Sequence, residues 1–337
     1  MYKQELTDIT MADIAVNVQN VTKHFIQWQR ENTEHGWFYN LLHPARKTLT
    51  AVDNISFSIP RGSFVAYAGP NGAGKSTTLK MLSGMLVPSQ GSIQVLGMSP
   101  QEDRIQLMKK LGVLFGNRSE LWWDHPVIQS YEWKKVVWEI PDAVYRKNLA
   151  MVTDLLELED LLPTFARELS LGQRMRADLG MMLLHSPELI LLDEPTLGLD
   201  VVAKRQMIDF LKRINQEQGV TILVTSHDMD DLEEMAQRVI MIAQGQLAYD
   251  GSWDGLRDLT GNLTHFTVTT SGKEIPFIEG CTLLSGSSGV FEYEADLSAM
   301  SIRTLLGQLS EMEGIQDVEI RKAPIEKVIA QLYNKWK

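Results

Sequence analysis

An α/β fold followed by a small α+β unit is the architecture that this sequence predicts, and three observations support it. Strand-like and helical apolar patterns alternate from residue 11 to about residue 255. Within that region, segments 189–192 and 220–225 suit central parallel strands that are covered on both faces. Beyond residue 256 the pattern changes to alternating half-exposed strands and two amphipathic helices, over 302–309 and 325–332.

Composition agrees with a mostly globular chain. The 337 residues are 44% hydrophobic and 22% charged, which is enough for one large domain and one smaller one. The formal net charge is -11, whereas binding to nucleic acid requires a basic surface that neutralises phosphates. We therefore expect no nucleic-acid partner.

The sequence also bears on the cellular compartment. The single cysteine, Cys281, cannot form an internal disulfide, which fits a reducing compartment. No apolar run approaches the roughly 18 residues that would span a bilayer, and the N-terminus lacks the apolar core of a signal peptide. These features predict a cytoplasmic protein that reaches a membrane only through partners, with residues 1–12 as a tail before the folded domain.

Residues 69–77 fit the pattern G-x-x-x-x-G-K-[ST] and lie between a strand-like segment, 63–68, and a helical one, 78–86. In such a loop the backbone N–H groups and the start of the helix surround phosphate oxygens. Lys75 can then reach the β- and γ-phosphates, and the Ser76 hydroxyl can ligate Mg²⁺. The alternative is a glycine-rich turn without a ligand, which the order strand, loop, helix disfavours. The candidate nucleotide-binding residues of this loop are Gly69, Asn71, Gly72, Gly74, Lys75, Ser76 and Thr77.

Two acids follow the apolar segment 189–192. Asp193 is placed to hold Mg²⁺ through water, and Glu194 is a candidate base for a water that attacks the γ-phosphate. A solvated loop would also contain adjacent acids, but it would not explain the four bulky aliphatic residues before them. His227 ends a neighbouring strand and can sense or position the γ-phosphate, although a lone histidine is more often structural.

A second anion-binding helix start is predicted at residues 169–173, before a helical stretch over 174–184. Within one chain, Ser170 and Gly172 cannot readily serve the same phosphate as Lys75, because each helix start needs its own approach. Two chains arranged head to tail solve this problem, with each chain lending Ser170 and Gly172 to the nucleotide of the other. A symmetric dimer then contains two composite sites.

In this order, the motifs resemble the ATPase subunit of an ABC transporter over residues 14–250. The motifs that carry the resemblance are Walker A at 69–77, the signature at 169–173, Walker B at 189–194, the D-loop at 198–200 and the switch histidine His227. The resemblance implies an ABC-type P-loop NTPase domain over 13–255, with a mixed sheet and a helical subdomain at about 118–185. It also implies ATP and Mg²⁺ as cofactors, with Gln173 and Asp200 at the nucleotide.

A narrower resemblance concerns residues 115–124 and the sequence Leu-Ser-Leu-Gly-Gln-Arg-Met-Arg of the signature region. Both are similar to a branch of bacterial ABC-2-type exporters that includes drug- and sodium-export ATPases. This implies a separate ABC-2-type membrane permease, a second ATPase chain as homodimer partner, and a location on the inner face of the cell membrane. The alternatives are an importer ATPase whose C-terminal domain binds a regulatory ligand, and a soluble ABC ATPase. The single signature and single Walker B disfavour the soluble protein.

Three positions depart from the family pattern. The Q-loop glutamine, which touches Mg²⁺ and the attacking water in the family, aligns with Asn117, whose side chain is shorter by about 1.5 Å. A bridging water would restore that contact. Leu171 replaces the first glycine of the signature, but the backbone contacts of Gly172 remain. Phe25 aligns with the aromatic residue that stacks on adenine and keeps its π-face without a hydroxyl.

For two aromatic-rich regions and for the C-terminal region, the sequence allows more than one role. The insertion at about 26–48 suggests a short amphipathic helix that ends in cations at 44–47. This helix would contact either the membrane or a membrane partner, or it would pack on its own domain. Four tryptophans at 122, 123, 133 and 138 suit a core or an interface equally, and the resemblance favours the permease interface. Residues 262–337 form the accessory α+β domain, with 285–289 as a turn. The domain resembles appendages that add dimer contacts or regulation in drug- and polysaccharide-export ATPases.

Overall fold

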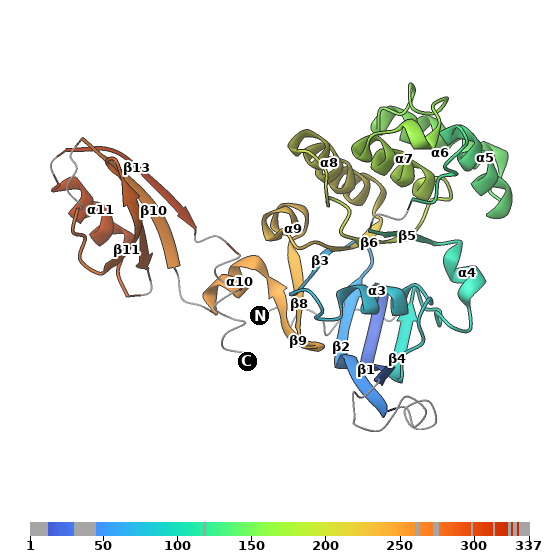
Figure 1. The fold of residues 1–337 in the computed structure, drawn as a ribbon, viewed down its shortest axis with the longest axis horizontal. Helices are drawn as coiled ribbons and strands as arrows, with labels where there is room; N and C mark the ends of the chain where they lie inside the picture. Colours follow the sequence, from blue (N-terminus) through green and yellow to red (C-terminus); the bar gives the residue numbers. More distant parts are fainter. Residues whose placement is uncertain are drawn as a thin grey trace, which may run out of the picture. The chain divides into compact units, whose positions relative to one another are not determined.

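The computed structural model describes residues 13–29, 45–116, 119–259, 263–271, 276–297, 299–312 and 314–322, together with Ile325 and Ile329. The chain divides into two compact units, Met1–Asp250 and Gly251–Lys337 (Figure 1). Within the described residues, the first unit contains two sheets and the second unit one, and each unit has its own hydrophobic core. In the described part of the chain, no helix combines the length and the apolar character needed to cross a membrane.

A six-stranded sheet organises the first unit. Its strands, in spatial order, are β5 (Leu111–Phe115), β6 (Leu189–Asp193), β7 (Thr221–Thr225), β3 (Phe64–Ala68), β8 (Arg238–Ala243) and β9 (Gln246–Ser252). The first five run parallel to one another. Because parallel strands end at the same edge of a sheet, the segments that follow β3, β6 and β7 meet there.

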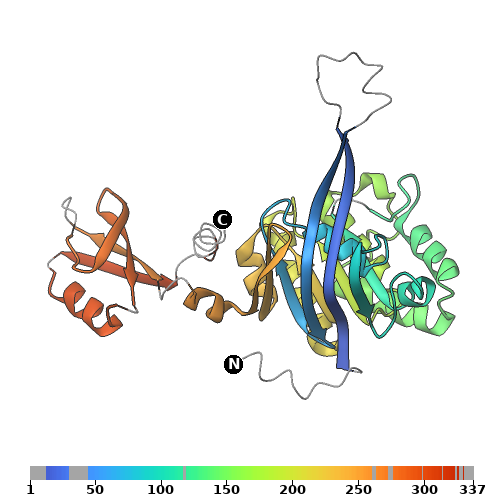
Figure 2. The same ribbon diagram turned by 90° about the horizontal axis from the view of Figure 1, so that it is seen from below.

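A second, three-stranded antiparallel sheet has the order β2-β1-β4, with β1 at Ile14–Gln29, β2 at Ala45–Pro60 and β4 at Gln90–Val95. Figure 2 shows β1 and β2 as a long hairpin that extends beyond the rest of the first unit. The predicted helix that ends at 44–47 is wrong within the described residues, because residues 45–47 belong to β2 and pair with residues 27–29. This pairing extends the sheet, and periodicity within the segment does not reveal it. Residues 30–44 lie outside the described part.

The core of the first unit joins the two sheets around α3 (Lys75–Leu82). Buried side chains from both sheets and from α3 form one cluster, which includes Val16, Ile55, Tyr67, Leu79, Leu82, Leu191 and Ile240. Helix α4 covers Arg104–Met108, and β5 already begins at Leu111. The apolar residues from Leu111 onward pair with β6 instead of continuing the helix.

Helices α5 (Val127–Val137), α6 (Asp142–Leu155) and α7 (Leu171–Leu183) lie together beyond β5 and β6 (Figure 1), and a 3-10 turn at Ala166–Glu168 precedes α7. Helix α5 packs closely on α7. The Tyr131 hydroxyl donates to the Ala177 carbonyl at 2.6 Å, and a Cβ at Gly180 would lie 2.4 Å from that hydroxyl oxygen. Helices α8 (Val201–Gln218) and α9 (Met229–Met235) complete the unit.

Buried titratable groups connect these helices to their surroundings. Asp178 on α7 accepts hydrogen bonds from the Ser119 hydroxyl and the Glu120 backbone N–H, both at 3.0 Å. Burial raises the pKa of Asp178 to about 6. His185 follows α7 and contacts the Leu111 carbonyl at 3.1 Å. Burial, with repulsion from nearby Lys134, lowers the pKa of His185 to about 4.

The second unit begins with α10 (Trp253–Asp258) and contains the antiparallel sheet β11-β12-β10-β13. The strands are β10 (Leu263–Thr270), β11 (Cys281–Ser287), β12 (Val290–Asp296) and β13 (Ile315–Lys322), and α11 spans Ile302–Ser310. The core includes Phe266, Val268, Phe291, Tyr293, Leu305 and Leu309. The predicted turn at 285–289 is too long, because residues 285–287 pair with β12 as part of β11. Of the predicted helix over 325–332, only Ile325 and Ile329 are described, and both are buried.

Candidate nucleotide-binding site

At two positions of the loop between β3 and α3, close contacts explain why the residue is glycine. A Cβ at Gly69 would lie 2.3 Å from the Ile242 carbonyl oxygen, and one at Gly74 would lie 2.4 Å from the Ala51 carbonyl oxygen. Gly74 also has a φ of 106°, a conformation that side chains rarely adopt. At Gly72 nothing lies within 4 Å of a Cβ position, and Asn71 beside it is exposed. The loop is therefore closely packed on one side and open on the other.

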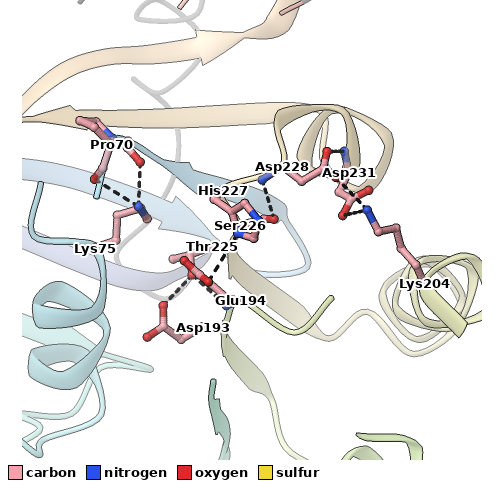
Figure 3. A network of polar contacts seen from close by, with 11 residues as sticks. Pro70, Lys75, Asp193, Glu194, Lys204, Thr225, Ser226, His227, Asp228 and Asp231 are labelled. Carbon is pink, nitrogen blue, oxygen red and sulfur yellow. Dashed lines mark hydrogen bonds and ion pairs between the residues drawn. The ribbon is translucent and has the colours of Figure 1, made fainter. Parts of the chain in front are cut away.

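Lys75 is the first residue of α3, and its side chain folds back along the loop (Figure 3). Its ammonium donates to the carbonyl of Gly69 at 2.7 Å and to that of Pro70 at 3.3 Å. Burial lowers the pKa of Lys75, and the negative charges of Glu194 and Asp193 oppose this effect. The ammonium is thus held within the loop, where an incoming anion can replace the two carbonyl contacts. Ser76 and Thr77 follow in the first turn of α3 and are partly exposed.

A short hydrogen-bond chain fixes the junction between the loop and α3. The hydroxyl of Tyr67, which is fully buried in β3, donates to Thr78 Oγ1 at 3.2 Å. Thr78 Oγ1 in turn donates to the Gly74 carbonyl at 3.1 Å. Burial raises the pKa of Tyr67, so the hydroxyl keeps its proton. The sequence pattern did not indicate this contact.

Asp193 is the last residue of β6 and pairs with Thr225 of β7, and Glu194 follows directly. The Thr225 hydroxyl donates to Asp193 Oδ1 at 2.7 Å. The Glu194 backbone N–H contacts both the hydroxyl and the carbonyl of Thr225, at 3.1 and 3.0 Å. Glu194 has a φ of 55°, a strained conformation that costs on the order of 1 kcal/mol and that these contacts stabilise. Thr225 therefore orients both acids, a role that the sequence analysis missed; the threonine at the end of the neighbouring strand was the available signal.

His227 follows β7 and lies beside Glu194, with 3.5 Å between His227 Nδ1 and Glu194 Oε2 (Figure 3). The imidazole is about half exposed. The structure thus brings an ammonium (Lys75), two carboxylates (Asp193 and Glu194) and an imidazole together at the edge where β3, β6 and β7 end. These groups were predicted as candidate site residues from three separate parts of the sequence.

The residues of the predicted second anion-binding end lie at the start of α7. Ser170 is the N-cap and forms a capping box with Gln173: the Gln173 N–H donates to Ser170 Oγ at 3.2 Å, and the Ser170 N–H donates to Gln173 Oε1 at 2.9 Å. A Cβ at Gly172 would lie 3.2 Å from Ala203 Cβ. Asp200 caps α8 by accepting from the Ala203 N–H at 2.8 Å. The first turns of α7 and α8 are therefore adjacent.

Two candidate residues remain, Phe25 and Asn117, and of these the structure describes Phe25. Phe25 of β1 pairs with Leu49 of β2, is partly exposed, and has the Lys23 ammonium 5.3 Å from its ring centroid. Asn117 lies outside the described residues. For Mg²⁺, the Ser76 hydroxyl and the Asp193 carboxylate supply the hard oxygen ligands that this ion prefers. Among the described residues, no group of three or more His, Cys, Asp and Glu side chains is arranged to hold a metal ion.

Fold and site together define a P-loop nucleotide-binding domain. A family model described as ABC transporter matches residues 52–197. The "Linearmycin resistance ATP-binding protein LnrL" of Bacillus subtilis (strain 168) is 30% identical over 252 residues, which cover 74% of this chain and 79% of LnrL. The "Uncharacterized ABC transporter ATP-binding protein YhcH" of the same organism is 32% identical over 198 residues, covering 59% of this chain and 64% of YhcH. The chain belongs to the family of ABC transporter ATP-binding proteins.

A solved structure agrees with this assignment. The dimeric, post-hydrolysis ATP-binding cassette MJ0796 bound to ADP and Pi matches with a TM-score of 0.58 at 25% identity, over 70% of this chain and 98% of the cassette. The predicted ABC ATPase fold is thereby confirmed. The chain spans 64%, 44% and 36% of the length of three of its relatives, so the activity, substrates and partners of the whole protein are matters for proposal.

Proposed function

We propose that this chain is the ATP-hydrolysing subunit of an ABC-2-type exporter and drives a separate membrane permease. The observation that carries the proposal is the meeting of Lys75, Asp193, Glu194 and His227 at one edge of the sheet. In this arrangement Lys75 binds the β- and γ-phosphates through its ammonium. Ser76 and Asp193 hold Mg²⁺, which, when bound, neutralises charge that develops on the phosphates.

Glu194 is the proposed general base. Its backbone is held by Thr225, and its carboxylate lies beside His227. The carboxylate accepts a proton from a water whose oxygen bonds to the γ-phosphorus, while the bond from the γ-phosphorus to ADP breaks. His227 positions the γ-phosphate next to that water. Phe25 stacks on adenine, and Asn117 takes the position of the Q-loop amide.

We further propose a head-to-tail dimer of two copies, in which Ser170, Gly172 and Gln173 of one copy bind the nucleotide of the other. The surface beside the start of α7 supports this. Val201 and Val202 in the first turn of α8 are 83% and 68% exposed, and Leu171 is also exposed. Exposed apolar side chains around a helix N-terminus suit burial by a second protein surface. Asp200 lies at the same junction.

The permease is proposed to dock on a tryptophan surface formed by Trp122, Trp123, Trp133, Val136 and Val137. All five side chains are exposed, and the rings of Trp122 and Trp133 lie 5.5 Å apart. Exposed aromatic clusters of this kind are typical of interfaces. Docking there would place the chain on the inner face of the membrane. Export as the direction of transport rests on similarity to relatives such as LnrL, whose name refers to linearmycin resistance.

The test compares two substitutions in the full-length chain. Glu194→Gln should retain ATP binding, lose steady-state hydrolysis and accumulate as an ATP-bound dimer in sedimentation experiments. Lys75→Ala should lose nucleotide affinity itself, because it removes the ammonium that contacts the phosphates. Hydrolysis by Glu194→Gln near the wild-type rate would refute the role of Glu194 as the base.

A further inference from the structure

The loop 226–228, which carries His227, is connected to α8 by one lysine. Lys204 Nζ lies 2.7 Å from Asp228 Oδ2 and 3.0 Å from Asp231 Oδ2 (Figure 3). Lys204 is one turn into α8, and its backbone N–H donates to the Asp200 carbonyl at 2.9 Å. A single ammonium therefore joins the first turn of α8 to the residue next to His227.

Asp228 transmits this contact to the loop. Its Oδ1 accepts from the Asp231 N–H at 3.2 Å and thus caps α9, while its Oδ2 is bound by Lys204. Its own N–H donates to Ser226 Oγ at 3.0 Å. Both neighbours of His227 along the chain are therefore held, which limits the directions in which the imidazole can point.

The lysine contact is partly shielded from water. The Lys204 side chain is 29% exposed, that of Asp228 is 35% exposed, and that of Asp231 is 8% exposed. The hydrogen bond that Lys204 donates to Asp228 raises the pKa of Lys204, so the lysine stays charged. Burial tends to raise the pKa of Asp228, but the hydrogen bond and charge of Lys204 lower it overall. The partly shielded ion pair of Lys204 and Asp228 restricts the loop more than a fully exposed surface pair would.

We propose that Lys204 is a positioning residue for hydrolysis: it holds loop 226–228 so that His227 faces Glu194. Lys204 acts through Asp228 and does not touch the nucleotide. Since α8 starts directly after Asp200, the same lysine ties the orientation of His227 to the first turn of α8. The proposal rests on the proposed function, because it needs Glu194 and His227 to act on ATP.

The chain offers a matched control on the same two helices. Lys212 of α8 pairs with Glu234 of α9 at 3.5 Å, at a similar exposure, but far along the helix from His227. Lys204→Met should lower kcat for ATP by about tenfold, since small misplacement near reacting groups costs one to two orders of magnitude in rate. KM for ATP and affinity for ADP should stay within about twofold, because Lys75 is untouched. Lys212→Met should leave kcat unchanged, and Lys204→Arg should restore most of the activity.

Asp228→Asn is a second variant, since an asparagine Oδ1 can keep the α9 cap while the ion pair weakens. It should show the same loss of kcat at unchanged ADP affinity. Equal kcat values for Lys204→Met and Lys212→Met would overturn the inference, as would a loss that Lys204→Arg fails to rescue. Glu194→Gln is measured beside them. Hydrolysis that depends on Glu194 but not on Lys204 refutes only this inference, whereas hydrolysis that is absent from the wild type or independent of Glu194 refutes the proposed function together with it.

Discussion

The contact between Thr225 and the two acids gives the most direct test of how the site is held. Thr225 is completely buried, and its hydroxyl donates to Asp193 while accepting from the Glu194 N–H. Thr225→Val replaces this hydroxyl by a methyl group of similar size. The Glu194 N–H keeps the Thr225 carbonyl as an acceptor at 3.0 Å, so the substitution removes chiefly the bond to the Asp193 carboxylate.

The size of the effect follows from the kind of bond. A hydrogen bond to a charged group contributes about 1.5–3 kcal/mol, so the free energy of unfolding should fall by about 2 kcal/mol. If all of this positioning is also lost at the transition state, kcat falls by about thirtyfold, and if half is lost, by about fivefold. We therefore expect a loss of kcat of about five- to thirtyfold, together with a higher Mg²⁺ requirement.

Thr221→Val is the matched control. Thr221 lies in the same strand and is equally buried, and its hydroxyl accepts from the Gly62 N–H at 2.9 Å at the opposite end of β7. Thr221→Val should lower the free energy of unfolding, measured in urea, by on the order of 1 kcal/mol and leave kcat unchanged. Steady-state phosphate release across a Mg²⁺ titration measures the difference. Equal kcat values for the two valine variants would show that Thr225 does not position Asp193 and Glu194.

Four further substitutions test the loop and two buried titratable groups by urea unfolding. Gly74→Ala should destabilise the chain by about 2 kcal/mol or more, whereas Gly72→Ala, which meets no atom, should cost about 1 kcal/mol from its positive φ alone. Equal losses would contradict the steric argument. Between pH about 4 and 6, folded Asp178 keeps a proton that the unfolded chain has lost, so its contribution to stability falls as pH rises, by roughly 3 kcal/mol in all. Over this pH range, the free energy of unfolding of Asp178→Asn should therefore rise by that amount relative to wild type. For His185 the pH dependence of stability has the opposite sign. His185 stays neutral in the fold, while in the unfolded chain it is protonated below pH about 6.5. The free energy of unfolding of His185→Gln should therefore rise relative to wild type as the pH falls towards 4. Parallel wild-type and variant curves would refute either assignment.

Local spacing predicted the parts of this protein that depend on neighbours in the chain. The phosphate loop at 69–77, the helix start at 169–173 and the acids after 189–192 were each predicted from residue types that lie close together in the chain. Such patterns can be recognised within one segment, because the residue types that a phosphate loop or a helix start requires stand close together in the sequence. The same patterns failed at residues that pair with another strand: residues 45–47 pair with 27–29, and residues 285–287 pair with 290–292.

The sequence by itself therefore determined the fold class and the candidate phosphate, base and sensor residues. Only the tertiary structure decided the strand order β6-β7-β3, which brings Glu194, His227 and Lys75 to one edge. It also decided which residues hold the site in place. Thr225 on the neighbouring strand β7 binds Asp193, and Lys204 on α8 binds Asp228 at the start of α9. The physical reason is that these contacts join residues 24 to 32 positions apart, or more, and no period or spacing within one segment encodes which segments become neighbours.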